Sequence, residues 1–247
     1  MTTTEKRTYP KFGAAIMQRN VRVVDLTREI FEGMPMWFGH QKTFINTNQT
    51  HEQFRTTYNT HLGFEAHNLL ISEHAGTHTD AVFEYDPNGP TLDKSPLEYY
   101  YGEAICLDLR GVQYPDYITA GDLQTALDRS GQRINQGDTV ILYTGYGDAT
   151  YPELAYTEKH TGLNREAALW LAEKGVVNIG VDNVAIDHAD DTEFSGHVVC
   201  GEYGIVNTEG LANLEQVVNQ RFLYFGLPLY IRNGTGSPIR AIAVFQD

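Results

Sequence analysis

Two histidines and an aspartate lie close together in the first third of the chain and carry side chains that bind metal ions. His74, His78 and Asp80 occur in SEHAGTHTD, at positions i, i+4 and i+6. The glycine and the β-branched neighbours argue against a continuous helix, so we expect a strand, a tight turn and an extended His-Thr-Asp segment. His78 and Asp80 would then point to the same side, with His74 swung toward them. Such a set suits Zn²⁺, Mn²⁺ or Fe²⁺ with positions open for water and substrate, although the spacing alone also fits a polar surface turn.

A second group of acidic residues and histidines lies in IDHADDTEFSGH, which contains Asp187, His188, Glu193 and His197. This segment directly follows an apolar run, and loops at the carboxyl ends of parallel strands are common ligand sites. The alternative is a solvated acidic loop, in which His197 is a surface or hydrogen-bonded histidine.

The elements that would position these residues are clearest between residues 103 and 182. Three short apolar runs, EAICLDL, GDTVILYTG and VVNIGVD, are typical of strands, and two helical segments lie between them. The first helix is expected to begin with a capping box of Thr119 and Asp122 and to stop at Gly131, and the second to begin at Asn164. The order β-α-β-α-β predicts parallel strands joined by crossover helices.

The rest of the chain is expected to add strands before and after this unit. VRVVDLT alternates as a strand, residues 41–73 look extended and end in NLLIS, and the tail contains RFLYFGLPLYIR, a Gly-rich turn at 233–237 and PIRAIAVF. We therefore expect one α/β domain over residues 21–247, preceded by an arm or irregular lead-in at residues 1–20.

Composition excludes several classes of protein. The 247 residues contain 18 Lys and Arg against 32 Asp and Glu, a net charge of −14, so phosphate backbones and anionic membranes would repel the chain. Two cysteines cannot make a disulfide framework or a CxxC zinc site. No apolar run reaches membrane-spanning length, and the N-terminus lacks a hydrophobic signal core. We expect a cytoplasmic protein whose partner is a small molecule, neither a nucleic acid nor a membrane.

Four motifs, in the right order, resemble the cyclase-like metal-dependent hydrolase family, which includes bacterial kynurenine formamidase and isatin hydrolase. They are DLTREIFEGMPMW, HAGTHTDA, GLNREAALWLAEKGVVNIGVDNVAIDH and GTGSPIRAIA, and they span most of the chain from Val23 onward. The resemblance implies a swivelling β/β/α fold, a homodimer or homotetramer, and hydrolysis of an amide or ester with a divalent metal ion.

The resemblance also implies a set of metal ligands. His74, His78 and Asp80 match the family's first ligand set. His197 and Glu209 match the pair that helps to hold a second metal in the two-metal members, where Asp80 would bridge the two ions.

Catalytic and substrate-binding residues follow partly from the resemblance and partly from a departure from it. Four residues after the hallmark aspartate, the family's usual histidine is replaced by Glu84. A glutamate can exchange a proton when burial raises its pKa, and it can also bind a metal, so Glu84 is the candidate acid/base and His188 the alternative. Trp37 and Phe38 fall where family members place aromatics against the substrate ring, and Tyr146 could add stacking surface.

The leading hypothesis is hydrolysis of a small cyclic or aryl amide, or a lactone, by a metal-activated water, as in isatin hydrolases. The alternative within the family is an arylformamidase acting on N-formylkynurenine. An isatin-hydrolase-like enzyme would use one Mn²⁺, and a formamidase-like enzyme two Zn²⁺. The sequence after Glu209 is closer to the isatin-hydrolase branch. Of the two ions, Mn²⁺ is preferred. A non-catalytic small-molecule binder and an isomerase or dehydratase that stabilises an enolate are alternatives from other classes.

Overall fold

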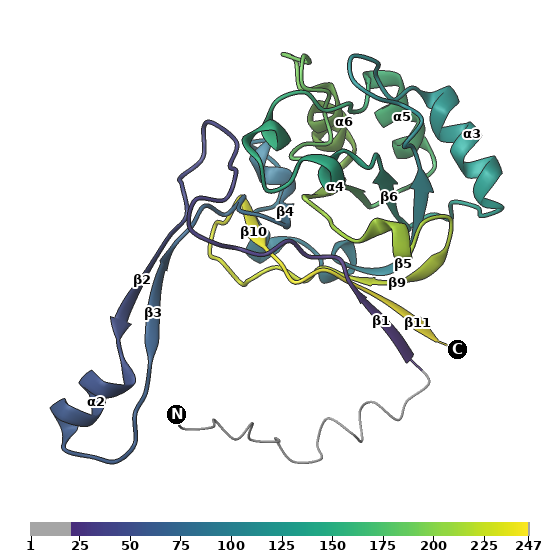
Figure 1. Cartoon of the computed structure of the whole chain (residues 1–247). Coiled ribbons are helices and arrows are strands. Elements are labelled where there is room, and N and C mark those ends of the chain that lie inside the picture. Colours follow the sequence, from purple (N-terminus) through teal and green to yellow (C-terminus); the bar gives the residue numbers. More distant parts are fainter. Residues whose placement is uncertain (1–20, 247) are drawn as a thin grey trace.

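The computed structural model describes residues 21–246, so the arm expected at residues 1–20 lies outside the described part. A curled, nine-stranded mixed sheet forms the body, in the order β1-β11-β9-β5-β6-β7-β8-β4-β10 (Figure 1). The strands are β1 (Val21–Asp25), β4 (His78–Asp80), β5 (Tyr101–Asp108), β6 (Thr139–Tyr143), β7 (Asn178–Val181), β8 (Val206–Glu209), β9 (Arg221–Phe225), β10 (Gly236–Pro238) and β11 (Ile242–Gln246).

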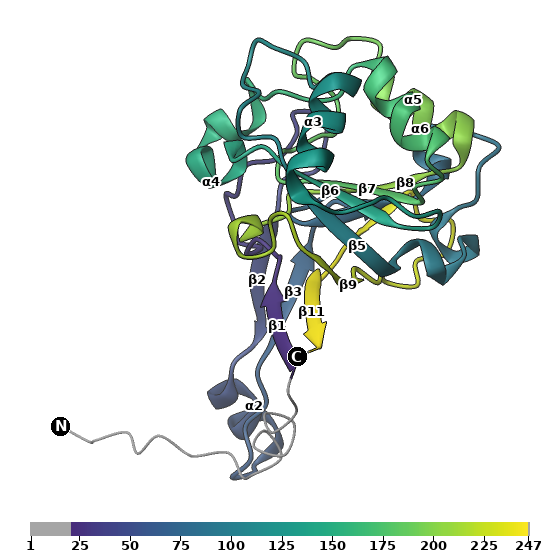
Figure 2. The same cartoon turned by 90° about the vertical axis from the view of Figure 1, so that its right-hand side faces the viewer.

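The parallel centre of the sheet confirms the β-α-β-α-β prediction. Strands β5, β6, β7 and β8 are parallel to one another, and helices α3 (Ala120–Ser130), α5 (Arg165–Glu173) and α6 (Ser195–Tyr203) cover one face (Figure 2). Thr119 and Asp122 form the expected capping box, and Gly131 ends α3 with a left-handed φ of 65°. Asn164 caps α5 by accepting a hydrogen bond from a backbone N–H of its first turn.

The central strands are buried on both faces, which explains their continuous apolar sequences. Ile105 and Leu107 of β5 pack under the helices, whereas the alternating Ala104 and Cys106 pack into a second core on the opposite face. That second core is closed by β1, β9 and β11, whose curl brings residues such as Tyr224 over the sheet. The sheet is thus a rigid base for the side chains at its far edge.

A hairpin arm projects from the body (Figures 1 and 2). It consists of β2 (Phe44–Gln49), α2 (His51–Tyr58) and β3 (Ala66–Leu70), and β2 pairs only with β3 among the described strands. The expectation of an extended segment here was wrong in its middle, because Thr50 and Gln53 form a capping box that starts α2. No side chain of α2 is buried.

Three further expectations differ from the structure. The predicted strand at 221–232 ends at Phe225, and Pro228, which has no N–H to donate, follows within three residues. Part of the Gly-rich turn at 233–237 belongs to β10 instead. The loop expected to contain His197 becomes helical at Ser195, and this places His197 in the first turn of α6.

Other elements complete the chain. A short helix, α4 (Tyr146–Thr150), follows β6. Among the described residues, none of the helices has both the length and the apolar character needed to cross a lipid bilayer.

Candidate metal centre

Three neighbouring strands bring the candidate ligands together. The short strand β4 pairs with β8 on one side and with β10 on the other, and all three of its residues are buried. His78 lies opposite Glu209, while Asp80 lies opposite Asn207 on β8 and Gly236 on β10. Because side chains two residues apart in a strand share a face, His78 and Asp80 point into the same space, as predicted.

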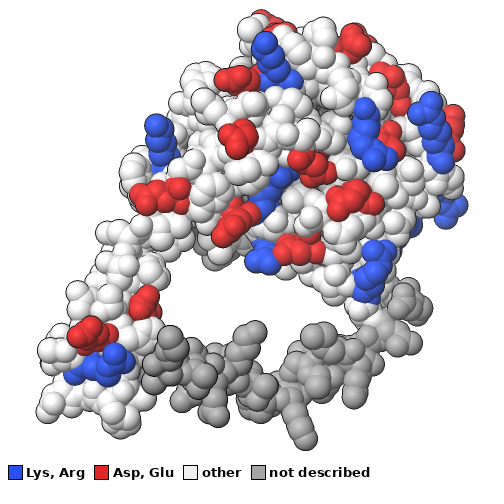
Figure 3. All heavy atoms as spheres, viewed as in Figure 1, with Lys and Arg blue, Asp and Glu red and all other residues white. Residues whose placement is uncertain are grey.

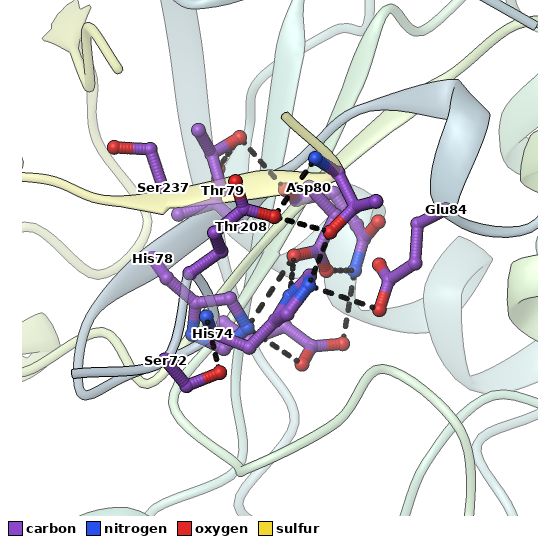
Figure 4. A network of polar contacts seen from close by, with 12 residues as sticks. Ser72, His74, His78, Thr79, Asp80, Glu84, Thr208 and Ser237 are labelled. Atoms are coloured by element: carbon purple, nitrogen blue, oxygen red, sulfur yellow. Dashed lines mark hydrogen bonds and ion pairs between the residues drawn. The ribbon is translucent and has the colours of Figure 1, made fainter. Parts of the chain in front are cut away.

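A tight turn before β4 adds the second histidine (Figure 4). Gly76 adopts a left-handed φ of 66°, a conformation that favours glycine, and reverses the chain between His74 and His78. The Nδ1 atom of His74 comes within 2.6 Å of Oδ1 of Asp80. The imidazole rings of His74 and His78 meet edge to face. The predicted turn is therefore confirmed.

The donor atoms fall into two groups that share one carboxylate. Candidate ligand atoms of His74, His78 and Asp80 lie within 4.8 Å of one another, and so do those of Asp80, His197 and Glu209. Asp80 is the common member, and its side chain is almost completely buried. The structure thus brings together all five residues that the sequence marked as ligands.

Hydrogen bonds behind two of the histidines orient them toward the carboxylates. Nδ1 of His78 donates to the carbonyl oxygen of Gly76, which leaves Nε2 facing Glu209 Oε2 at 3.5 Å. Nδ1 of His197 pairs with the buried carboxylate of Asp187, and its Nε2 lies 3.5 Å from Glu209 Oε1. A histidine held in this way presents its free ring nitrogen to a metal ion.

The backbone of β10 approaches the site so closely that only glycine fits at Gly236. A Cβ atom there would lie 2.6 Å from Cε1 of His74 and 3.0 Å from Oδ1 of Asp80. Next to it, Thr235 Oγ1 lies 3.0 Å from His74 Nε2 and donates to Glu73. The GTGSP motif therefore lies against the candidate ligands.

Charge balance shows that the donor set fits a cation. Burial would raise the pKa of Asp80, but the facing His78 and His74 hold it below its ordinary value. Burial would lower the pKa of His78, but Asp80 and Glu209 raise it to about 9. For Glu84, burial and the charge of Asp80 raise the pKa to about 8. These pKa shifts place protons on the histidines and on Glu84 that balance the carboxylates, and a divalent cation bound by the same atoms would replace them.

A cavity of about 350 Å³ opens over the cluster. Its polar side includes most of the candidate ligands together with His40, Glu84 and Glu193, and no Lys or Arg is among the described residues that line it. Its apolar side is formed by Trp37, Tyr85, Val184, Ala185, Phe194 and Val198. An apolar, partly aromatic wall opposite a few polar groups is typical of a small-molecule site.

Glu84 and Trp37 lie at this cavity, as the sequence predicted. Glu84 ends a short 3₁₀ turn after β4, and its Oε1 lies 3.5 Å from His74 Nε2 (Figure 4). The ring of Trp37 meets that of Phe194 edge to face, with 6.5 Å between ring centroids. These two rings border the cavity together.

The other three predicted residues are not among those that line the cavity. His188 is buried, with its ring stacked on Tyr117 at 3.9 Å between centroids. The hydroxyl of Tyr146 donates to the carbonyl of Ala155. Phe38 is 90% exposed, and its ring centroid lies 5.0 Å from that of Trp37. The geometry therefore favours Glu84 over His188 as the proton carrier.

The sequence interpretation missed two residues that line the cavity, His40 and Tyr85, and one buried residue of the donor cluster, Asn207. His40 stacks on His74 at 4.8 Å between ring centroids, and the ring of Tyr85 lies edge-on to His197. Asn207 contacts both carboxylates of the second donor group. Its position two residues before Glu209 in a strand was a usable signal, since such residues share a face.

Comparison with known proteins gives the family and the fold of the chain. Residues 24–188 match the sequence profile of the cyclase family, described as "Putative cyclase". The chain is 27% identical over 223 residues to a kynurenine formamidase of Salinibacter ruber, covering 89% of this chain and 96% of the relative. A kynurenine formamidase of Bacillus cytotoxicus is 30% identical over 175 residues, covering 70% and 77%. An isatin hydrolase bound to the product analogue thioisatinate superposes with a TM-score of 0.81 at 21% identity, covering 95% and 96%. The chain belongs to the cyclase family.

Proposed function

We propose that this protein is a metal-dependent hydrolase that cleaves the C–N bond of a small cyclic or aryl amide, or the C–O bond of a lactone. The observation that carries the proposal is the set of partly buried His74 and buried His78 and Asp80 on one side of an aromatic-lined cavity. The names of the relatives, kynurenine formamidase and isatin hydrolase, support an amide as the bond that is cleaved.

The chain's own residues supply the proton transfer and the positioning of the substrate. A divalent ion, Mn²⁺ or Zn²⁺, held by His74, His78 and Asp80 would polarise the carbonyl and lower the pKa of a bound water. Glu84 takes the proton of the attacking water and returns it to the leaving nitrogen or oxygen as the bond breaks. The rings of Trp37 and Phe194 border a planar substrate and keep bulk water from one side of it.

The cavity favours an uncharged substrate. Among the described residues that line it, no Lys or Arg is available to pair with a substrate carboxylate, whereas Glu84 and Glu193 are both present. This composition supports a neutral cyclic amide or lactone. N-formylkynurenine remains the second candidate because the curated relatives carry the name kynurenine formamidase.

A single assay series tests the proposed function. Tag-free protein with Mn²⁺ or Zn²⁺ is incubated with isatin, N-formylkynurenine and simple aryl lactones in ¹⁸O-labelled water, and the product mass is measured. Hydrolysis adds one labelled oxygen, whereas an isomerase, a dehydratase or a binder adds none. Folded His78→Ala and Asp80→Ala proteins should lose activity and bound metal together; full activity in both variants would refute the proposal.

We also propose that the chain forms a homodimer through the hairpin arm. An eight-residue helix and a two-stranded hairpin are both marginally stable on their own, and the arm exposes large apolar side chains. A homotetramer, the cytoplasmic location and the division into residues 1–20 and 21–247 stay predictions from the sequence.

A further inference from the structure

The two donor groups share Asp80, so the number of metal ions depends on what fills the second group. Asn207 is fully buried on β8, directly opposite Asp80. Its Nδ2 atom lies 2.7 Å from Asp80 Oδ2, 2.9 Å from Glu209 Oε1 and 3.3 Å from His197 Nε2. These three atoms belong to the three residues of the second donor group, so the amide nitrogen lies where they converge.

We propose that Asn207 closes the second donor group, so that this site takes a single divalent cation bound by His74, His78 and Asp80. The proposal deepens the proposed function and rests on it, because it assumes that the first donor group binds a metal ion.

The partners of the amide determine which of its atoms faces the carboxylates. An amide NH₂ offers two donors and cannot act as a metal ligand, whereas the amide oxygen only accepts. The two nearest atoms, Asp80 Oδ2 and Glu209 Oε1, are carboxylate oxygens that need donors. The nitrogen of Asn207 therefore faces them, and a cation cannot occupy the same place while it does.

The two oxygens of each carboxylate have different partners. Glu209 Oε1 accepts from Asn207 and from the backbone N–H of Ile186, which leaves Oε2 facing His78. Asp80 Oδ2 accepts from Asn207, and Oδ1 faces His74 and His78. One oxygen of each carboxylate is thus held by the amide, and the other points toward the first donor group.

The strand positions keep Asn207 in place. β8 is paired on both sides, with β7 and with β4, so its backbone cannot shift to withdraw the side chain. Asn207 Oδ1 has no hydrogen-bond partner among the described residues. A rotation that turned this oxygen toward the carboxylates is the one arrangement in which Asn207 would help to hold a second ion.

Metal stoichiometry of the full chain tests the proposal without relying on activity. Tag-free protein is saturated with Mn²⁺ and, separately, with Zn²⁺, and bound metal per chain is measured by elemental mass spectrometry and by titration calorimetry. We expect one equivalent in the wild type. Asn207→Ala removes the amide and Asn207→Asp replaces it with a carboxylate, and each should raise the count to two. Asn178→Ala, which alters another buried strand asparagine, should stay at one.

Each other outcome overturns the proposal in a distinguishable way. Two equivalents in the wild type, falling to one in Asn207→Ala, would make Asn207 a ligand and would leave the proposed function intact. One equivalent in all folded variants would show that Asn207 does not limit the count. No uptake by the wild type would overturn both this inference and the proposed function. Circular dichroism of each variant checks that it is folded. If Asn207→Ala does not fold, the metal count of Asn207→Asp tests the proposal.

Discussion

At the scale of single residues, Glu84 is the proposed proton carrier, at the position where the sequence resemblance implies a histidine. Burial and the charge of Asp80 raise the pKa of the Glu84 carboxyl to about 8, so an acid as well as a base is accessible near neutral pH. The carboxyl also lies close to His74, which leaves two roles for it, proton transfer or metal ligation.

Replacement of Glu84 by glutamine separates the two roles. If Glu84 carries the proton, Glu84→Gln should lower kcat by about 10²- to 10⁴-fold with bound metal unchanged, because a side-chain amide cannot exchange the proton. The measurement is kcat together with metal content per chain. Glu193→Gln, at the exposed rim of the same cavity, is the matched control and should change kcat only a few-fold. Loss of metal in Glu84→Gln would instead assign the residue as a ligand.

Titration of His160, which is not one of the candidate ligands, should make the free energy of unfolding depend on pH. The histidine is buried and its Nε2 has no partner among the described residues, so burial lowers its pKa to about 4. Between pH 6.5 and 4 the unfolded chain binds a proton that the folded chain does not, so stability is lost as the pH falls through this window.

Chemical denaturation of wild type and His160→Leu at several pH values tests this effect. The unfolding free energy of the wild type should fall by up to about 3 kcal/mol more than that of the variant from pH 7 to pH 4. Parallel pH profiles for the two proteins would show that His160 is not the group responsible.

At the scale of elements, the regular parts of the fold could be predicted and the strands of the site only in part. The apolar runs of β5, β6 and β7 and the caps of α3 and α5 are local signals, and they were confirmed. β8 has the sequence VNTE, in which polar residues occupy buried positions, so no apolar run marked it. Its burial depends on pairing with β4 and β7, which is a property of the tertiary structure.

The close approach of β10 gives a prediction for Gly236. In Gly236→Ala the new methyl group must displace His74 or Asp80, because their atoms lie 2.6 and 3.0 Å from the Cβ position. We expect metal affinity to fall at least tenfold while the fold is retained, measured by titration calorimetry. Gly111→Ala is the control, since a Cβ there meets nothing within 4 Å. Unchanged affinity in Gly236→Ala would mean that the strands can separate without disturbing the ligands.

At the scale of the whole molecule, charge and apolar surface are distributed unevenly. The body carries many charged side chains, whereas the hairpin arm is largely uncharged (Figure 3). Between residues 44 and 70 the charged residues are Glu52, Arg55 and Glu65, in a chain of net charge −14. Two copies of so acidic a chain repel each other least where their charge density is low, so the arm suits self-association.

Disruption of the arm should therefore change the oligomeric state. We expect a dimer by sedimentation velocity and at least tenfold weaker association in Leu69→Glu, because a two-fold axis would bring two new carboxylates into an apolar interface. Leu97→Glu, a similarly exposed leucine on the body, should leave the dimer intact. A monomeric wild type at tens of micromolar would contradict the proposed interface.

More of the candidate site than of the surrounding fold could be predicted from the sequence. His74, His78 and Asp80 are close in sequence, so spacing and the glycine turn were enough to bring them together. His197 and Glu209 needed the family resemblance, because only β8 and α6 carry them to β4. His188 and Tyr146 have suitable side chains, but tertiary packing holds them against Tyr117 and Ala155 and outside the cavity lining.

The pairing of β4 with β8 has a consequence for how the chain folds. Asp80 and Asn207 are 127 residues apart in sequence, and the whole β-α-β-α-β unit lies between them. Helices such as α3 form from local contacts, whereas this pairing must close a long loop and is therefore slow. During refolding, the helical circular dichroism signal should recover before β8 brings Glu209 to the other ligands. The completed cation site therefore marks a late stage of folding.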